Sequence, residues 1–207
     1  MPELPKFPPG FFDRQDESDD AQFYAMPRLV VHIDAATIES LTQAYRDLLP
    51  REGAVLDLMS SWVSHLPEEI HFGRVTGLGM NRVELERNPR LTDHVVHDLN
   101  RDPELPFEDA SFDAVINAVS IQYLAKPVSV FRSAARVLRP GGIHMVALSH
   151  RCFPTKAIRA WYALGPPERL HLVRTYFELS DAYEEPTVED RSPSGADPLW
   201  IVMARRR

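Results

Sequence analysis

The apolar and polar positions of this chain alternate between short apolar runs and longer amphipathic stretches. Five apolar runs are short enough to be buried strands, and turn-forming residues flank each of them. The runs lie at 54–58, 74–78, 94–97, 112–118 and 143–148. The intervals between them are long enough for crossover connections. A further apolar run at 199–204 follows Pro198 and predicts a last buried strand.

Apolar residues at helical spacing predict helices around these runs. Asp34 is a candidate N-cap for a helix with apolar positions 38, 41, 45 and 48, which ends at Pro50. A second helical face at positions 128, 131, 135 and 138 ends at the Pro-Gly-Gly turn of 140–142. Thr155 is predicted to cap a helix over 155–161, and positions 170, 173 and 177 define another.

Alternating strands and helices predict an α/β fold, a doubly wound and mostly parallel sheet with helices on both faces. Right-handed crossovers then place the turns after the strands along one edge of the sheet, where ligands bind in such folds. The residues expected at this edge are Asp57, 77–81, 98–101, 117–123 and 148–151.

The composition fits one globular domain preceded by an arm. The chain has 207 residues, of which 44% are hydrophobic and 26% charged, enough for one substantial core. We expect an N-terminal arm or lid at 1–33 and a single domain at 34–207. The arm is acidic and rich in proline, but its aromatic residues favour an irregular packed segment over the alternative, a disordered leader.

Charge and cysteine content narrow the partners and the compartment. A net charge of −7 argues against binding to nucleic acid or to an anionic membrane surface. The lone Cys152 excludes an internal disulfide and a thiolate metal cluster, and no secretory signal core is visible. We therefore expect a soluble cytoplasmic protein without a metal site. An apolar surface left by Trp161, Tyr162, Phe177 and Trp200 would suit an acceptor or a homodimer.

Three sequence segments lie at a spacing that is more specific than any one of them. They are Asp-Leu-Asn-Arg-Asp-Pro-Glu-Leu-Pro-Phe-Glu-Asp-Ala-Ser-Phe-Asp-Ala-Val at 98–115, Ser-Ile-Gln-Tyr-Leu at 120–124 with Pro127 after it, and Arg-Val-Leu-Arg-Pro-Gly-Gly at 136–142. Together they resemble the second half of a class I S-adenosylmethionine-dependent methyltransferase of the small-molecule, type 11-like group. The resemblance implies a Rossmann-like core at 50–150, an antiparallel C-terminal strand and a substrate-side segment at 149–190.

The turn after the first strand departs from the pattern of that family. Asp57 keeps the acid at the end of the strand, but Met59, Ser61 and Val63 stand where the family has three glycines that let the backbone approach the cofactor. Two alternatives follow for this turn. Either Ser60 and Ser61 keep it narrow, or Trp62 fills the pocket.

The resemblance assigns the other cofactor contacts unevenly. On the second strand, Gly79 stands where the family has the ribose-binding acid, and Gly77 is also assigned to the cofactor site. Asn81 is the candidate for one ribose hydroxyl, and Glu84 on the following helix is either a nearby contact or only solvated. Asp98 matches the acid that meets the adenine amino group, with the Leu99 amide at the ring edge. The alternative for Asp98 is a cap on the following turn.

The chemical residues are expected at the ends of the fourth and fifth strands. Val119 is assigned to the cofactor pocket, and Asn117 and Ser120 to the methyl-transfer site, although Asn117 could merely satisfy buried backbone. His150 is the best-placed proton acceptor, with His32 and His97 as alternatives. Acceptor contacts are predicted for Tyr123, Arg151 and Lys156, against the alternative of a solvated basic helix face.

Two residues of the arm complete the predicted site. Arg28 is expected to clasp the methionyl carboxylate of the cofactor and so to replace part of what the glycine turn supplies. Tyr24 is expected to stack on the cofactor or to close the lid over it.

The resemblance therefore implies in-line methyl transfer from S-adenosylmethionine to a small-molecule acceptor, with alignment supplying much of the acceleration. The alternative is a non-catalytic protein of the same fold that has lost cofactor binding and acts as a binding or regulatory partner. A nicotinamide dehydrogenase is disfavoured because no Gly-x-Gly-x-x-Gly follows the first strand.

Overall fold

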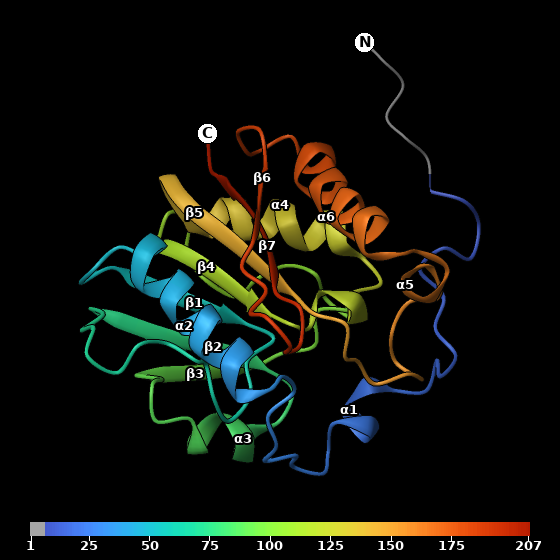
Figure 1. Ribbon diagram of the computed structural model, residues 1–207, viewed down its shortest axis with the longest axis horizontal. Helices are drawn as coiled ribbons and strands as arrows, with labels where there is room; N and C mark the ends of the chain where they lie inside the picture. The colour runs from blue at the N-terminus through green and yellow to red at the C-terminus, as the bar shows by residue number, and fades with distance from the viewer. Residues whose placement is uncertain (1–6) are drawn as a thin grey trace.

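Seven strands form one mixed sheet in the order β3-β2-β1-β4-β5-β7-β6 (Figure 1). The computed structural model describes residues 7–207. The strands are β1 Ala54–Leu58, β2 Arg74–Gly79, β3 Asp93–Val96, β4 Phe112–Ala118, β5 Leu138–Leu148, β6 Thr187–Asp190 and β7 Trp200–Arg205. The first five run parallel, and β7 pairs antiparallel with both β5 and β6. The predicted doubly wound α/β sheet with an antiparallel C-terminal strand is confirmed.

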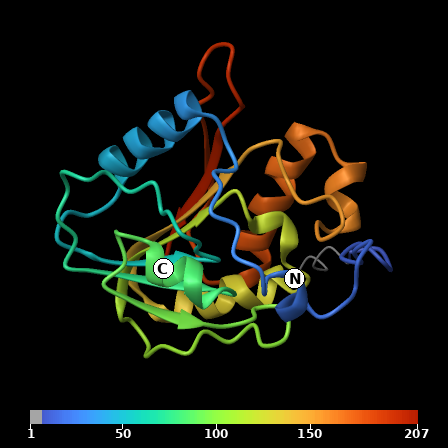
Figure 2. The same ribbon diagram turned by 90° about the horizontal axis from the view of Figure 1, so that it is seen from below.

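Helices cover both faces of this sheet. They are α1 Asp20–Phe23, α2 Ala35–Leu48, α3 Arg82–Arg87, α4 Pro127–Val137, α5 Arg159–Ala163 and α6 Pro166–Ser180, with a 3-10 turn η1 at Ile121–Tyr123. Figure 2 shows α2 on one side of the sheet and α4 on the other. The predicted cap of α2 is confirmed, because the Asp34 side chain accepts a hydrogen bond from the Thr37 amide at 2.9 Å.

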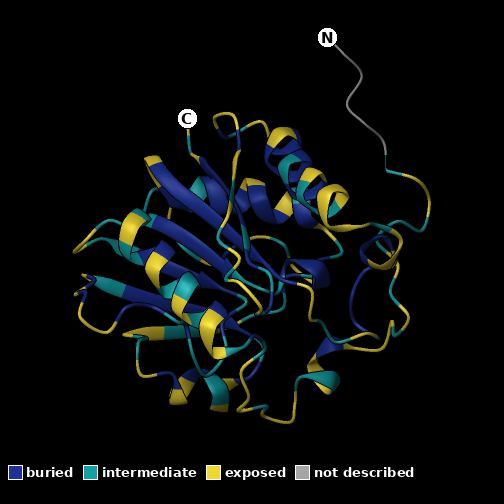
Figure 3. Ribbon diagram, in the orientation of Figure 1, coloured by how far each residue is buried: buried dark blue, intermediate teal, exposed yellow. Residues whose placement is uncertain are grey.

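The alternation of side chains along each strand divides the core into two layers. Val55 of β1 packs with Leu41 and Tyr45 of α2, whereas the next residue, Leu56, packs with Phe131 of α4 on the opposite face. Because the central strands are buried on both faces, they read as continuous apolar runs (Figure 3). The strand predictions succeeded for this reason.

The connection from β1 to β2 contains no helix, contrary to the predicted alternation. Residues 59–73 form an irregular loop instead, which fills the α2 layer with the buried side chains of Leu66, Ile70 and Phe72. Polar contacts inside the loop hold its shape. The Ser64 hydroxyl donates to the Asp57 carboxylate at 2.6 Å and accepts from the side-chain nitrogen of Asn88 at 2.8 Å. The segment 97–111 between β3 and β4 also lacks a helix.

Two element starts and one strand differ clearly from the sequence predictions. β5 begins at Leu138, directly after α4, so the Pro-Gly-Gly turn lies inside the strand rather than at a helix end. α5 begins only at Arg159, after Ile158, and Thr155 does not cap it; the Thr155 carbonyl accepts the Asp16 amide at 2.9 Å instead. β6 was not predicted, because its four residues are mostly exposed and carry no apolar run.

The described part of the arm packs on the domain. Phe7 and Phe12 contact Tyr176 of α6 with ring centroids 6.2 and 6.3 Å apart, so residues 7–33 are not a disordered leader. Residues 1–6 of the predicted arm lie outside the described residues.

Of the apolar surface predicted from Trp161, Tyr162, Phe177 and Trp200, only Tyr162 is exposed, at 52%, and Trp200 is half-buried. Trp161 and Phe177 are only 2% and 1% exposed, because both side chains belong to the core beneath α6. Among residues 7–207, no helix is long and apolar enough to cross a membrane.

Candidate functional site

A cavity of about 340 Å³ lies at the carboxyl ends of β1, β2 and β4, beneath the arm. This volume is in the range of pockets that bury small ligands. The predicted residues that line it are Tyr24, Arg28, Asp57, Met59, Ser60, Ser61, Gly79, Asn81, Asp98, Leu99, Val119, Ser120, Tyr123 and Arg151. Four other predicted residues, Gly77, Asn117, His150 and Lys156, do not line it.

The glycine-free turn after β1 adopts a backbone conformation that normally favours glycine. Met59 has φ +60°, and the following Ser60 amide donates to the Leu78 carbonyl of β2 at 2.8 Å. A side chain in this left-handed conformation costs about 1–2 kcal/mol. The turn is therefore narrow without glycine, and the Met59 side chain stands on the cavity wall.

Asp57 organises this turn from within. Its buried carboxylate accepts the hydroxyls of Ser60 and Ser64, each at 2.6 Å on the same oxygen. Burial raises the pKa of Asp57 to about 6, although the two hydroxyls oppose the shift. The acid at the end of β1 thus fixes the shape of the loop that follows it.

Gly79 occupies the position of the missing ribose acid, and the turn explains the absence of a side chain there. A Cβ at Gly79 would collide with the Ser60 carbonyl oxygen of the turn. Gly77 has a different reason, because a Cβ there would meet the Leu91 side chain in the interior. The turn after β1, which lacks glycine, and the end of β2, which lacks an acid, therefore meet in one close contact between Gly79 and the Ser60 carbonyl.

Most of the hydrogen-bonding capacity of Asn81 is used by the arm and by α3, and one lone pair of its side-chain oxygen stays free for a ribose hydroxyl. Its side-chain oxygen caps α3 by accepting the Glu84 amide at 3.1 Å, and its nitrogen donates to the carbonyls of Tyr24 and Ala25 at 2.8 and 3.1 Å. Asn81 therefore joins the arm to α3 on the cavity wall, and its contact with the ribose stays a prediction.

Glu84 is not merely solvated. Its carboxylate accepts the Ser61 hydroxyl and the Arg28 amide, both at 2.7 Å. Glu84 thus connects the turn after β1 with the arm, on the wall of the cavity.

Asp98 combines the two roles that the sequence left as alternatives. One oxygen caps the following turn by accepting the amides of Asn100 and Arg101 at 2.9 and 3.2 Å. Its second oxygen and the amide of Leu99 make no hydrogen bond with any described residue, and both residues line the cavity. An acceptor and a donor therefore stand side by side at this end of the cavity.

The end of β4 presents one unpartnered hydroxyl. Val119 turns the chain with φ +46°, and the Oγ of the next residue, Ser120, is buried on the cavity wall without a partner among the described residues. Asn117 lies within β4, where its side-chain nitrogen donates to the Leu58 carbonyl at 3.1 Å. Asn117 thus ties β4 to β1 and does not line the cavity, while its side-chain oxygen is buried without a partner among the described residues.

His150 points away from the cavity. It is exposed, with Nε2 3.6 Å from a carboxylate oxygen of Asp197. Arg151 does reach the cavity, but its guanidinium also pairs with Asp197, at 2.8 and 3.0 Å. The structure therefore removes the geometric argument for His150 as a proton acceptor.

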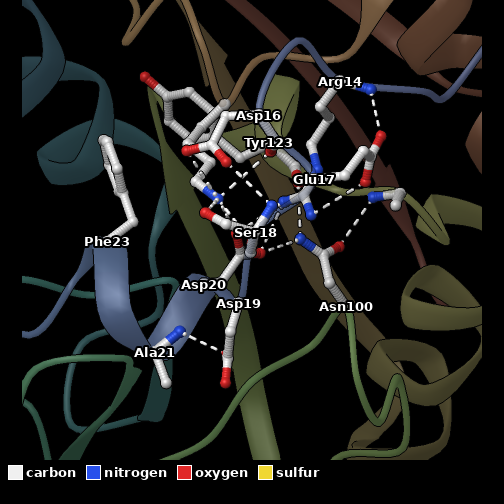
Figure 4. Close-up of polar contacts among 12 residues, drawn as sticks. Arg14, Asp16, Glu17, Ser18, Asp19, Asp20, Ala21, Phe23, Asn100 and Tyr123 are labelled. Atoms are coloured by element: carbon white, nitrogen blue, oxygen red, sulfur yellow. Dashed lines mark hydrogen bonds and ion pairs between the residues drawn. The ribbon is translucent and has the colours of Figure 1, made fainter.

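Lys156 belongs to a buried polar cluster that holds the arm. Figure 4 shows the arm side of this cluster, with Arg14, Asp16, Asp20 and Asn100. Its fully buried ammonium lies 3.2 Å from Asp16 and 3.0 Å from Asp20. Asp20 also binds Arg14 at 2.6 Å and the Asn100 side chain at 2.9 Å. Because these carboxylates enclose it, Lys156 has no access to an acceptor, and we assign it to the arm instead.

Arg28 lies on the cavity wall without an anionic partner. Its guanidinium stacks on Phe23 and Phe153, 4.4 and 5.3 Å from the ring centroids, and donates to the Phe23 carbonyl at 2.9 Å. Among the described residues it makes no ion pair. Trp62 does not plug the cavity, because its indole nitrogen donates to the Val30 carbonyl of the arm at 2.9 Å.

Sequence reasoning missed several residues of this wall, including Val30, Val31, His65, Leu78, Met80 and Phe153, and named His32 only as an alternative. Tyr123 is on the wall as predicted, but its hydroxyl accepts the Phe153 amide at 2.7 Å. No motif marks His65, which reaches the cavity only because the helix-free loop takes a left-handed backbone there.

The sequence of this chain is similar to a known protein family and to known proteins. Residues 59–146 match the family described as methyltransferase domain. A malonyl-[acyl-carrier protein] O-methyltransferase of Marinomonas sp. (strain MWYL1) is 31% identical over 164 residues, which cover 77% of this chain and 58% of the relative. The chain spans less than two thirds of the length of the curated relatives that it matches.

Two solved structures have a similar fold. The [4+2]-cyclase SpnF superposes with a TM-score of 0.61 at 16% identity, over 81% of each chain. An S-adenosylmethionine-dependent methyltransferase from Mesorhizobium loti superposes with a TM-score of 0.57 at 19% identity, over 81% of this chain and 98% of that one. At these identities the likeness concerns the fold alone.

Proposed function

Because this chain belongs to the class I S-adenosylmethionine-dependent methyltransferase family, we propose that it transfers a methyl group to a small organic acceptor. The observation that carries the proposal is the cavity at the carboxyl ends of the parallel strands, where Asp98 and Leu99 offer an unpaired acceptor and donor. S-adenosylmethionine would supply an activated methyl group on its sulfonium.

The residues present fit an adenosine cofactor at the β3 and β4 ends. Asp98 would accept from the adenine amino group, and the Leu99 amide would donate to the ring edge. The unpartnered Ser120 Oγ supports a polar ligand group next to it, because a buried hydroxyl without a partner is destabilising. Gly79 offers no side chain to the ribose, so ribose recognition would rest on the second lone pair of the Asn81 oxygen and on other groups.

The chain's contribution to the reaction is mainly alignment. The arm and the segment after β5 close the cavity with Tyr24, Val31 and Phe153, which exclude water from a reacting pair. Holding an acceptor in line with the transferred carbon supplies much of the acceleration of such a reaction. The size of the cavity and the arm above it support a small acceptor or the end of a longer one.

Isothermal titration calorimetry with S-adenosylmethionine and S-adenosylhomocysteine tests the proposal. We expect the intact chain to bind both, and Asp98→Ala to bind at least about tenfold more weakly because a hydrogen bond to a charged group is lost. Asp93→Ala removes an exposed carboxylate of β3 outside the cavity and is the matched control. No binding of either nucleoside at millimolar concentration would refute the proposal.

One observation favours a second candidate function, a non-catalytic binding protein of the same fold. The ribose acid is absent, and the turn after β1 leaves no room for one at Gly79. The same titration separates the two, since a protein that has lost the cofactor would show no heat with either nucleoside and no protection against thermal unfolding.

A further inference from the structure

The exposed apolar side chains of this protein gather on one short segment of the arm. Residues 7–207 have eight exposed large apolar side chains, and four of these lie within six consecutive residues: Met26, Leu29, Val30 and Val31. Figure 3 shows much of this stretch between α1 and α2 as exposed. Single exposed apolar residues are normal, but a contiguous group of them marks a ligand groove or an interaction site. We term residues 26–31 the apolar strip.

Polar contacts fix the backbone of the apolar strip. The Trp62 indole nitrogen donates to the Val30 carbonyl at 2.9 Å, and the Glu84 carboxylate accepts the Arg28 amide at 2.7 Å. Just before the strip, the Asn81 side chain donates to two consecutive backbone carbonyls of the arm. Because these contacts use backbone groups of the arm, they hold the strip in place and leave its apolar side chains on the surface.

The apolar strip continues into the cavity. Val30 and Val31 line the cavity wall and are nevertheless 53% and 47% exposed, which places them at its mouth. Phe153, from the segment after β5, lines the same wall and packs against His32, the residue after the strip, with ring centroids 5.2 Å apart. A molecule that enters the cavity past the strip therefore passes over apolar side chains.

The apolar strip presents little charge to the solvent. Its only charged residue, Arg28, is half-buried, and its guanidinium lies 4.4 and 5.3 Å from the ring centroids of Phe23 and Phe153. Glu84 lies next to the strip on α3, but both of its carboxylate oxygens already accept hydrogen bonds. The surface of the strip therefore suits an apolar group and offers no partner to an ion.

The sizes of the cavity and of the strip decide what kind of molecule covers the strip. A cavity of about 340 Å³ is near the lower limit of small-ligand pockets, which span about 300–1,000 Å³, and the proposed cofactor would take up much of it. A second ligand of any length must then extend outwards through the mouth. A specific protein interface uses about 20–30 residues on each side, far more than the strip has. The strip is therefore suited to part of one small molecule.

We propose that the methyl acceptor is an amphipathic small molecule whose reacting end enters the cavity and whose apolar chain lies over Met26, Leu29, Val30 and Val31. The proposal rests on the proposed function, because it names the class of acceptor for the same site. Each methylene group that the strip removes from water strengthens binding by about twofold to fourfold, the lower value applying where only one side of the chain is covered.

Competition with a neutral fluorescent probe tests the apolar strip. N-phenyl-1-naphthylamine is bound to the protein saturated with S-adenosylhomocysteine, and 1-hexanol, 1-octanol and 1-decanol are then titrated as competitors. We expect the affinity of the alcohols to rise by about twofold to fourfold for each added methylene group. Because the cofactor product is present throughout, the alcohols report on the mouth of the cavity and not on the nucleoside site.

Leu29→Asp and Val30→Asp should each weaken 1-decanol binding by at least about tenfold and reduce the gain per methylene group, because covering a carboxylate with an alkyl chain is unfavourable. Both are measured at saturating S-adenosylhomocysteine. Val188→Asp is the matched control, since Val188 of β6 is 38% exposed and lies outside the cavity, and it should bind 1-decanol like the unaltered chain. A thermal unfolding scan of each variant confirms that the compared proteins are folded.

The amphipathic acceptor is refuted if alcohol affinity does not depend on chain length, or if Leu29→Asp and Val30→Asp bind 1-decanol normally. Two other results also overturn it. If these variants lose only cosedimentation with phosphatidylcholine vesicles, the strip contacts a membrane, and if they only turn a dimer into a monomer in sedimentation velocity, it contacts a second copy. Failure of the proposed function is distinct, because S-adenosylhomocysteine then gives no heat in calorimetry. The alcohols are in that case titrated into the protein alone, and binding that needs Leu29 and Val30 retains the strip as an apolar ligand site.

Discussion

The ammonium of Lys156 lies 3.0 Å from a carboxylate oxygen of Asp20 and is completely buried there. This contact joins the arm to the segment that follows β5. Asp20 also holds Asn100, whose amide in turn binds Asp98 on the cavity wall. This buried cluster thus connects the arm, the loop after β3 and the segment after β5; Figure 4 labels Asp16, Asp20 and Asn100 of it.

Removing the charge at Lys156 should destabilise the fold strongly. Lys156→Met removes the cation that Asp16 and Asp20 share; losing one partner of a buried ion pair costs about 3–5 kcal/mol, and the lower end applies because Arg14 and Asn100 still hold Asp20. We expect a loss of this size in the free energy of unfolding, measured by urea denaturation. Lys126→Met is the control, since Lys126 is exposed and makes only a 3.4 Å contact to the Arg101 carbonyl. Equal stability of the two variants would contradict the assignment.

Sequence patterns predicted the sheet because burial on both faces imposes continuous apolar runs on its central strands. The sequence patterns did not predict that Lys156 is buried, because its neighbours in sequence have the pattern of a solvated basic helix. Its partners Asp16 and Asp20 lie in the arm, and no periodicity links two segments so far apart. The loop at 59–73 failed for a related reason, since its apolar residues fill the α2 layer without helical spacing.

The cavity could be placed from sequence, but the state of its side chains could not. Strand ends and motif spacing located Asp57 and Asp98 at the correct edge. Whether Asn81 is free or engaged depends on the carbonyls of Tyr24 and Ala25, which only the folded arm brings close. His65 was missed because its direction depends on one left-handed residue.

A methyl group at Gly79 should disturb the turn after β1. The Cβ of Gly79→Ala would collide with the Ser60 carbonyl, which is backbone and cannot rotate away. We expect a loss of about 1–3 kcal/mol in the free energy of unfolding. Gly165→Ala is the control, because only the flexible Glu168 side chain must move there. An unchanged stability of Gly79→Ala would show that the turn yields easily and that an acid at this position is excluded by something else.

Asp57 should make the stability of the protein depend on pH near neutrality. Burial raises the pKa of its carboxyl to about 6 in the native state, above the ordinary value of 3.8. The native state therefore binds this proton more tightly than the unfolded state, and the stabilisation is complete below about pH 4 and lost as the pH rises through about 6. Ionised Asp57 thus costs about 2–3 kcal/mol at pH 8.

Asp57→Asn keeps an oxygen that accepts the Ser60 and Ser64 hydroxyls but cannot ionise. The difference in unfolding free energy between this variant and the unaltered chain should therefore shift in favour of the variant by about 2–3 kcal/mol between pH 4 and pH 8. Urea denaturation at both pH values measures it. A difference that stays constant across this range would show that the Asp57 carboxyl titrates normally.

Arg28 should contribute to cofactor affinity through the geometry of its guanidinium rather than through charge alone. It is the cavity-wall arginine without an ion pair among the described residues, and its guanidinium lies 4.4 and 5.3 Å from the ring centroids of Phe23 and Phe153. Arg28→Ala should weaken S-adenosylhomocysteine binding by more than about tenfold, and Arg28→Lys should recover little of it, because an ammonium offers neither the planar stack nor paired donors. Binding of 5′-methylthioadenosine, which lacks the amino-carboxylate, should change much less in both variants. If both nucleosides lose affinity equally, Arg28 acts by holding the arm in place and makes no contact with a carboxylate.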